Sequence, residues 1–198
     1  TDEGVEIASS EELGRRLAIN PEQIRKDLAF FGQFGKKGVG YYVTELKESI
    51  GSILGLDQHW NVAIIGMGHL GAALANYQGI ARLGFHLVAI FDVNPVVIGT
   101  RVGERRVEDI AYLAEIIAER DVQIGVIAVP AAHAQDVADQ LVAAGIRGIW
   151  NFAPVKLQVP PNVPFVSEDL SVGLSSLSYY LTHTSAENEE LSDKKLPD

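Results

Sequence analysis

The strongest constraint on the fold of this chain is a Gly-x-Gly-x-x-Gly sequence at residues 66–71. It follows an apolar stretch that predicts a buried strand, and it opens a segment with helical character. In that context the first glycine permits a tight turn, and the second lets the backbone approach a pyrophosphate at the helix N-terminus. The third glycine allows the helix to pack closely on the strand. The alternative is that the glycines only form a packing turn, but this does not explain the carboxylate at residue 92.

Asp92 ends the second apolar stretch, LVAIFD, 21 positions after Gly71. A carboxylate at this place can bind both ribose hydroxyls of an adenosine, and its charge repels a 2′-phosphate. The strand, the spacing and the acid therefore predict a site for NAD(H) rather than NADP(H).

Residues 58–154 alternate between strand-like and helix-like segments. The predicted strands are Asn61–Gly66, His86–Asp92, Gln123–Val129 and Gly148–Phe152, and helices are expected from about Leu70, near Asp109–Glu119 and near Ala132–Ala144. Continuous apolar strands such as VAIIG and IGVIAV indicate a parallel sheet buried on both faces. We therefore predict the α/β class, with a doubly wound Rossmann domain over residues 58–165.

Further cofactor contacts are expected where the third and fourth strands end. Val129-Pro130 and Asn151–Pro154 occupy those carboxyl ends, where ligands of such sheets bind, and would line the nicotinamide side. The alternative is that their prolines only interrupt ordinary loops. The expected cofactor-binding residues are Gly66, Met67, Gly68, His69, Leu70, Gly71, Asp92, Val93, Val129, Pro130, Asn151, Phe152, Ala153 and Pro154.

Residues 1–57 read as short helices and turns. Ser9 is the predicted N-cap of a helix through about Ala18, and Asn20-Pro21 begins a second helix through about Phe31. The glycine-rich stretch GQFGKKGVGYYV predicts a β-hairpin, and Thr44 is expected to cap a last helix. Two helices joined by a short turn and followed by a hairpin form a winged helix-turn-helix.

The charge of the chain is unevenly distributed. The formal net charge is −10, yet residues 13–47 carry seven bases and three acids. A basic island in an acidic chain indicates one local contact with DNA, whereas a solvated charged face is the alternative. Arg25 and Lys26 would lie on the exposed side of the recognition helix, with Lys36 and Lys37 at the tip of the wing.

Several other classes of protein are disfavoured. The chain has no cysteine, and its five histidines lack metal-ligand spacing, so no metal is expected. It has no Tyr-x-x-x-Lys, and no histidine lies beside an acid at a suitable place, so an enzyme is not expected. It has no apolar run of the roughly 18 residues that span a membrane, and its acidic start has no signal-peptide core. We expect a cytoplasmic protein.

The tail begins after a proline-rich stretch. A helix from about Glu168 to Leu181 repeats leucine at Leu170, Leu174, Leu177 and Leu181. Because the prolines separate it from the preceding domain, we expect residues 166–184 to pack on a partner subunit. The polar residues 185–198 are expected to be disordered.

Taken together, residues 5–184 resemble the Rex family of redox-sensing repressors. The specific part is QIRKDLAFFG at residues 23–32 running into GKKGVGY at 35–41, joined in the family's order to GMGHLG, FDVNP, VP and NFAP. The resemblance implies a homodimer with an N-terminal winged helix, a central Rossmann domain and a C-terminal helix swapped into the partner. The expected DNA-binding residues are Gln23, Arg25, Lys26, Lys36, Lys37 and Tyr41.

The resemblance also implies a mechanism. NADH binding would release palindromic operator DNA, whereas NAD+ would be the weaker competing ligand. Asp169 falls where the family has an acidic residue involved in switching. The chain also departs from the family. It starts after the first helix of the family's DNA-binding domain, and Leu170 stands where some relatives present an aromatic residue.

Two other functions remain open on the sequence. One is an NAD-dependent oxidoreductase with a small appended domain, and the missing catalytic group speaks against it. The other is a module that binds CoA or another nucleotide, since related Rossmann domains hold CoA, and Asp92 at the ribose position favours NAD instead.

Overall fold

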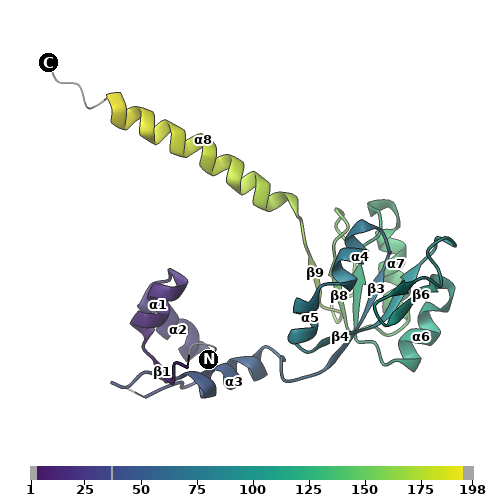
Figure 1. Cartoon of the computed structure of the whole chain (residues 1–198), viewed down its shortest axis with the longest axis horizontal. Coiled ribbons are helices and arrows are strands. Elements are labelled where there is room, and N and C mark those ends of the chain that lie inside the picture. The colour runs from purple at the N-terminus through teal and green to yellow at the C-terminus, as the bar shows by residue number, and fades with distance from the viewer. Residues whose placement is uncertain (1–3, 37, 194–198) are drawn as a thin grey trace. The chain divides into compact units, whose positions relative to one another are not determined.

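The computed structural model describes residues 4–36 and 38–193 (Figure 1). Two compact units result, and each is described by itself. The first holds Thr1–His59 with Arg82–Gly84, and the second holds Trp60–Ala81 with Phe85–Asp198. The division follows His59, whereas the sequence places it after residue 57.

The second unit is built on a seven-stranded sheet in the order β5-β6-β4-β3-β7-β8-β9. Its strands are β3 (Trp60–Ile65), β4 (Phe85–Asp92), β5 (Arg101–Val102), β6 (Arg105–Asp109), β7 (Ile124–Ile127), β8 (Gly148–Asn151) and β9 (Phe165–Ser167). All neighbours pair in parallel except the β5–β6 pair. Numbered along the chain, the parallel strands follow the order 3-2-1-4-5-6 of the Rossmann fold. The predicted doubly wound fold is confirmed.

Helices cover both faces of this sheet (Figure 1). They are α4 (His69–Ala75), α5 (Gln78–Arg82), the 3₁₀ helix η1 (Ile110–Tyr112), α6 (Leu113–Glu119) and α7 (Ala131–Ala143). Ala63 and Ile65 of β3 face one core with α6 and α7, and Val62 and Ile64 face a second core with Leu74 of α4. This alternation explains why β3 is apolar at every one of these positions.

Four short elements of the second unit, α5, β5, β6 and β9, had no prediction from the sequence. β5 and β6 form a hairpin rich in arginine at one end of the sheet, and β9 closes the other end as three exposed residues. β5 and β9 are edge strands that bury few side chains, so they lack the apolar run that marks the central strands.

The first unit contains the predicted helix-turn-helix. α1 (Ser10–Leu17) and α2 (Pro21–Phe31) are joined at Ala18, which adopts a left-handed conformation with φ of +54°. The Oγ of Ser9 accepts from Glu12 N at 3.1 Å, and the Oδ1 of Asn20 accepts from Glu22 N at 2.8 Å. Both predicted N-caps are confirmed.

The wing is smaller than predicted. Residues before the turn contribute one bridge, Lys36 to Gly40, rather than a strand. β2 (Tyr41–Tyr42) instead pairs with β1 (Ile7–Ala8), so the start of the chain takes the place of a hairpin partner. Gly35 fits this turn because its φ is +75° and an added Cβ would lie 2.5 Å from the Gly40 oxygen.

The expected Thr44 cap is wrong. α3 (Val43–Ile53) follows β2 directly, with Tyr42 as an N-cap that makes no side-chain bond. Val43 N donates to Glu6 O at 2.9 Å, so pairing with the first residues of the chain fixes where the helix begins.

The C-terminal helix is longer than predicted. α8 runs from Ser171 to Asp193, so the backbone is helical through residues 185–193, which the sequence assigns to a disordered tail. This stretch contains alanine, glutamate and leucine, which favour helix. Residues 194–198 lie outside the described part.

Candidate functional site

The fold creates one topological switch point. β3 and β7 are neighbours in the sheet, but β3 continues toward β4 on one side and β7 toward β8 on the other. Ligands of open α/β sheets bind in the crevice outside the carboxyl ends of such a strand pair. Here those ends lead into Gly66 and Ala128.

Gly66 and Gly71 are required by close packing at this crevice. Gly66 has a φ of +98°, and a Cβ added to it would lie 2.7 Å from the Ala128 oxygen. A Cβ on Gly71 would run into the Gly66 oxygen. The roles expected for the first and third glycines of the motif agree with this geometry.

Gly68 differs from these two glycines. It is exposed, and a Cβ added to it would meet no atom within 4 Å. It is also the N-cap residue of α4 and provides no side-chain bond to the first turn. The open space therefore lies where the helix N-terminus could receive a phosphate, and a dinucleotide fits this part of the site.

Asp92 is held beside the glycine loop. Its Oδ2 accepts from Met67 N at 2.5 Å and its Oδ1 accepts from Asn94 N at 2.8 Å. The side chain is half-buried, and each oxygen keeps lone pairs for a further donor. The carboxylate is thus oriented by backbone amides and available to a pair of ribose hydroxyls. The neighbouring Val93 is 72% exposed and offers an apolar surface.

Asn151 ends β8, as the sequence predicts. Its side chain is fully buried, and Nδ2 donates to Ala153 O at 3.0 Å, Val155 O at 3.2 Å and Ser167 Oγ at 3.2 Å. Its Oδ1 accepts from Ala153 N at 3.0 Å. The carboxamide therefore shapes the loop after β8 and ties it to β9.

The other residues expected on the nicotinamide side vary in exposure. Val129 is half-buried beside Gly66, and Pro130 is exposed as the N-cap residue of α7. Phe152 is half-buried with its ring 4.6 Å from that of Trp150, Ala153 is buried, and Pro154 is exposed. His69 is exposed and Leu70 half-buried at the start of α4.

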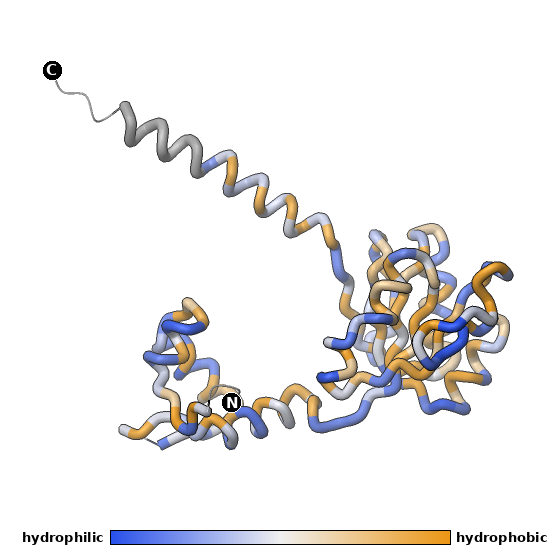
Figure 2. Tube along the Cα trace, in the orientation of Figure 1, coloured by the Kyte–Doolittle hydropathy of each residue, from blue (hydrophilic) through white to orange (hydrophobic). Residues whose placement is uncertain are grey.

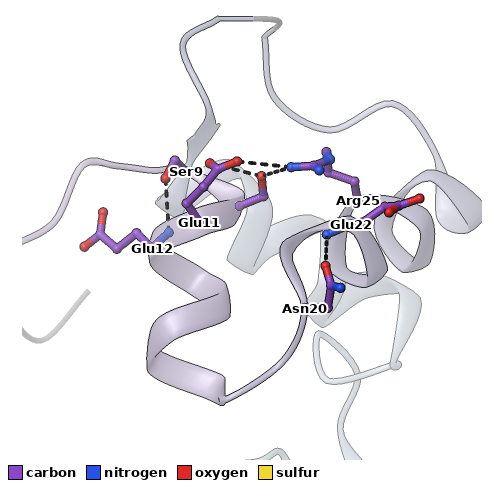
Figure 3. Close-up of polar contacts among 7 residues, drawn as sticks. Ser9, Glu11, Glu12, Asn20, Glu22 and Arg25 are labelled. Atoms are coloured by element: carbon purple, nitrogen blue, oxygen red, sulfur yellow. Dashed lines mark hydrogen bonds and ion pairs between the residues drawn. The ribbon is translucent and has the colours of Figure 1, made fainter.

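The predicted DNA-contact residues of α2 are exposed and already engaged. Arg25 Nη1 donates to Ser10 Oγ at 2.7 Å and lies 3.2 Å from Glu11 Oε1, as Figure 3 shows. Lys26 pairs with Glu22 at 3.1 Å, and Gln23 Nε2 donates to Asp27. The basic side chains therefore project from α2 as expected.

The wing residues divide into three cases. Lys36 is exposed, with Nζ 5.4 Å from the centre of the Tyr42 ring. Lys37 lies outside the described residues. Tyr41, expected at the DNA surface, is only 9% exposed, because the pairing of β2 with β1 brings it into the small core.

Asp169 caps the C-terminal helix. Its Oδ1 accepts from Ser171 Oγ at 2.6 Å and from Ser171 N at 2.9 Å. The bond from the Ser171 hydroxyl, and to a smaller extent the bond from its backbone N–H, lower the pKa of Asp169 below its ordinary value. The described structure thus gives this residue a local role at the start of α8.

The described residues show neither a membrane-spanning helix nor a metal-binding cluster. Within residues 4–36 and 38–193, no helix has the length and apolarity to cross a membrane. The same residues contain no cluster of histidine and acidic side chains able to hold a metal ion.

Comparison with known proteins places this geometry in a family. Residues 57–155 match the family described as CoA binding domain, and residues 1–29 match the putative DNA-binding protein N-terminus. The redox-sensing transcriptional repressor Rex of Chloroflexus aurantiacus is 48% identical over 180 residues, which are 91% of this chain and 85% of the relative. A Rex repressor of Thermotoga maritima is 48% identical over 179 residues, 90% of this chain and 85% of its own.

The chain belongs to the Rex family. Solved structures agree. One is a Rex-family repressor in complex with NAD+ and operator DNA, which is 39% identical to this chain and has a TM-score of 0.88. The match covers 98% of this chain and 89% of the repressor. The complex of that repressor with NADH has a TM-score of 0.86 over 95% of this chain and 88% of its own. The resemblance seen in the sequence is confirmed, and Rex relatives are regulators, not enzymes.

Proposed function

We propose that this protein is a transcriptional repressor that senses the NADH/NAD+ balance. It binds operator DNA through its N-terminal unit when NADH is low, and NADH binding to its Rossmann domain releases the DNA. The observation that carries the proposal is the combination in one chain of an exposed recognition helix and an oriented Asp92 beside the open space at Gly68. Its Rex relatives are named redox-sensing transcriptional repressors. As a regulator of transcription, the protein would act in the cytoplasm.

The Rossmann unit would distinguish the two oxidation states by charge. Gly66, Gly68 and Asp92 would hold the adenosine and pyrophosphate, which NADH and NAD+ share. Residues 129–130 and 151–154, which would lie near the nicotinamide half of the cofactor, include no acidic side chain. An unpaired positive charge is costly to bury, so these residues favour the neutral dihydronicotinamide over the nicotinamide cation.

The C-terminal helix supports a homodimer. From Ser171 to His183 every side chain of α8 is exposed, including Leu174, Leu177 and Leu181. Figure 2 shows apolar residues recurring along this helix. A second copy, exchanging α8, would cover them and place two recognition helices on a palindrome whose half-sites lie about 34 Å or a multiple apart.

Leu177→Glu is expected to weaken the dimer at least about 100-fold. Each dimer buries two copies of this leucine, each worth roughly 1.5–3 kcal/mol, and the new carboxylate adds a desolvation cost. Sedimentation equilibrium measures the shift toward monomer. Ser175→Glu adds the same charge on another side of the helix and should have a smaller effect. Equal effects of the two variants would contradict a leucine interface.

Asp92→Asn is expected to weaken NADH binding about ten-fold or more and to reduce discrimination against NADPH. The carboxylate provides charge-assisted hydrogen bonds to ribose hydroxyls, each worth about 1.5–3 kcal/mol. Calorimetry with both nucleotides measures the change. Asp109→Asn is the matched control, since Asp109 pairs in register with Asp92 on the next strand. Unchanged NADH affinity in Asp92→Asn would remove Asp92 from the site.

Calorimetric titration of the wild-type chain with NADH and with NAD+ tests the proposed function. Tighter binding of NADH by at least about ten-fold, at one site per subunit, is expected. Added NADH should then release bound duplex DNA. Equal affinity for the two nucleotides would contradict a redox sensor.

CoA is the second candidate ligand, because residues 57–155 match a family described as CoA binding domain. Asp92 argues against it, since CoA carries a 3′-phosphate on the ribose that the carboxylate would repel. CoA should therefore fail to compete with NADH. Displacement of NADH by CoA at equal concentration would favour the second candidate.

A further inference from the structure

Arg25 of the recognition helix is held by the other helix of the motif. Its Nη1 donates to Ser10 Oγ at 2.7 Å and contacts Glu11 Oε1 at 3.2 Å, and both partners begin α1 (Figure 3). Ser10 is 7% exposed, so its hydroxyl is a fixed anchor. Within the described residues these contacts leave the Nε and Nη2 of Arg25 free to donate to another molecule.

Lys26 provides the contrast within the same helix. It pairs with Glu22 one turn earlier, and both side chains are more than 60% exposed. Such a pair moves with its own helix and is weakly held. The contacts of Arg25 instead join residues 14 and 15 positions apart in sequence, so they fix the direction of the guanidinium relative to α1.

Glu11 is an anion under physiological conditions. Its own backbone N–H, the hydroxyls of Ser9 and Ser10, and the charge of Arg25 all lower the pKa of this carboxyl, although desolvation opposes them. The side chains of Arg25 and Glu11 are 50% and 67% exposed, so their ion pair contributes little to folding stability. Its effect is on the position of Arg25 and on the local field.

These two effects bear on DNA in opposite ways. A fixed guanidinium loses less rotamer freedom when it meets a base edge, which favours a bidentate contact with guanine. A carboxylate beside it repels every phosphate, whatever the sequence. A DNA that brings a base within reach of Arg25 offsets this repulsion, and a DNA that offers only phosphates does not.

We propose that Glu11 is a specificity-determining residue of the DNA reader, which positions Arg25 for base contact and opposes binding to unrelated sequence. This inference rests on the proposed function, because it assumes that α2 meets operator DNA. Glu11 itself touches no base. It acts through Arg25, with Ser10 as the second anchor.

The test compares Glu11→Gln with the wild-type full chain. Affinity is measured for the palindromic duplex that the wild type enriches from a random pool, and for a scrambled duplex of equal length and composition, at several salt concentrations. Glu11→Gln should bind the scrambled duplex more tightly, and its ratio of operator to scrambled affinity should fall about ten-fold. If the freed Arg25 then contacts a phosphate, the salt slope on the scrambled duplex should steepen by about 0.9.

Glu22→Gln is the matched control. It also removes one negative charge, but from a residue whose ion pair in the described structure is with Lys26. It should therefore raise both affinities alike and leave their ratio unchanged. In an Arg25→Ala background, Glu11→Gln should no longer change the ratio, because the pair acts as one unit. Circular dichroism verifies that each variant is folded.

Three results would overturn the inference. An equal change of ratio in Glu11→Gln and Glu22→Gln would reduce Glu11 to a general charge effect. A full effect of Glu11→Gln without Arg25 would show that it does not act through the guanidinium. A wild-type chain that enriches no duplex would overturn the DNA half of the proposed function as well, so the two failures are distinguishable.

Discussion

Gly71→Ala is expected to destabilise the Rossmann unit by about 3 kcal/mol and to reduce NADH binding below calorimetric detection. The added methyl group would clash with the Gly66 oxygen, which is backbone and cannot rotate away. α4 must therefore move off β3, and the loop between them moves with it. Because the same loop donates Met67 N to Asp92, the displacement reaches the ribose site as well as the phosphate site.

Gly68→Ala is the matched control for this prediction. Gly68 has an extended backbone conformation, with φ of −71° and ψ of −170°, and its Cβ would enter open space. Thermal unfolding should therefore match the wild type, whereas NADH affinity should fall because the methyl group occupies ligand space. A Gly71→Ala protein that unfolds at the wild-type midpoint and binds NADH normally would contradict the packing role of Gly71.

The parts of the structure that the sequence predicts well are those in which neighbouring residues decide the outcome. Ser9 and Asn20 cap helices because their side chains reach amides two or three residues ahead. The central strands are recognised because both of their faces are buried, which requires a continuous apolar run. The glycine motif and Asp92 are local to two strand ends, and the sheet order brings these ends together.

The parts of the structure that the sequence predicts less well depend on contacts between residues far apart in the chain. β1 takes up Tyr41, so a residue expected on the surface lies in the core. Arg25 has the expected place on its helix, but its partners Ser10 and Glu11 follow from how α1 packs on α2. The bond of the Asn151 side chain to Ser167 has no signal in the sequence, because Ser167 belongs to the edge strand β9.

Asn151→Leu is expected to lower the free energy of unfolding by about 4 kcal/mol. Leucine fills a similar volume but leaves the buried Ala153 N and the acceptors Ala153 O, Val155 O and Ser167 Oγ without the carboxamide. Each buried polar group that loses its partner costs roughly 1–3 kcal/mol, and the groups share one network. Chemical denaturation followed by the fluorescence of the neighbouring Trp150 measures the loss.

The consequence for function follows from where this network lies. The backbone oxygen of Asn151 also accepts a hydrogen bond from Glu168 N at 2.8 Å. Glu168 directly precedes Asp169, the capping residue of α8. Loosening the loop after β8 should therefore disturb both the nicotinamide side and the start of the dimer helix. Asn76→Leu is the control. Asn76 is exposed, and among the described residues its side chain donates to Ala72 O, so the change should alter stability by at most about 0.5 kcal/mol. If Asn151→Leu were as stable as Asn76→Leu, the carboxamide would not be what ties the loop after β8 to β9.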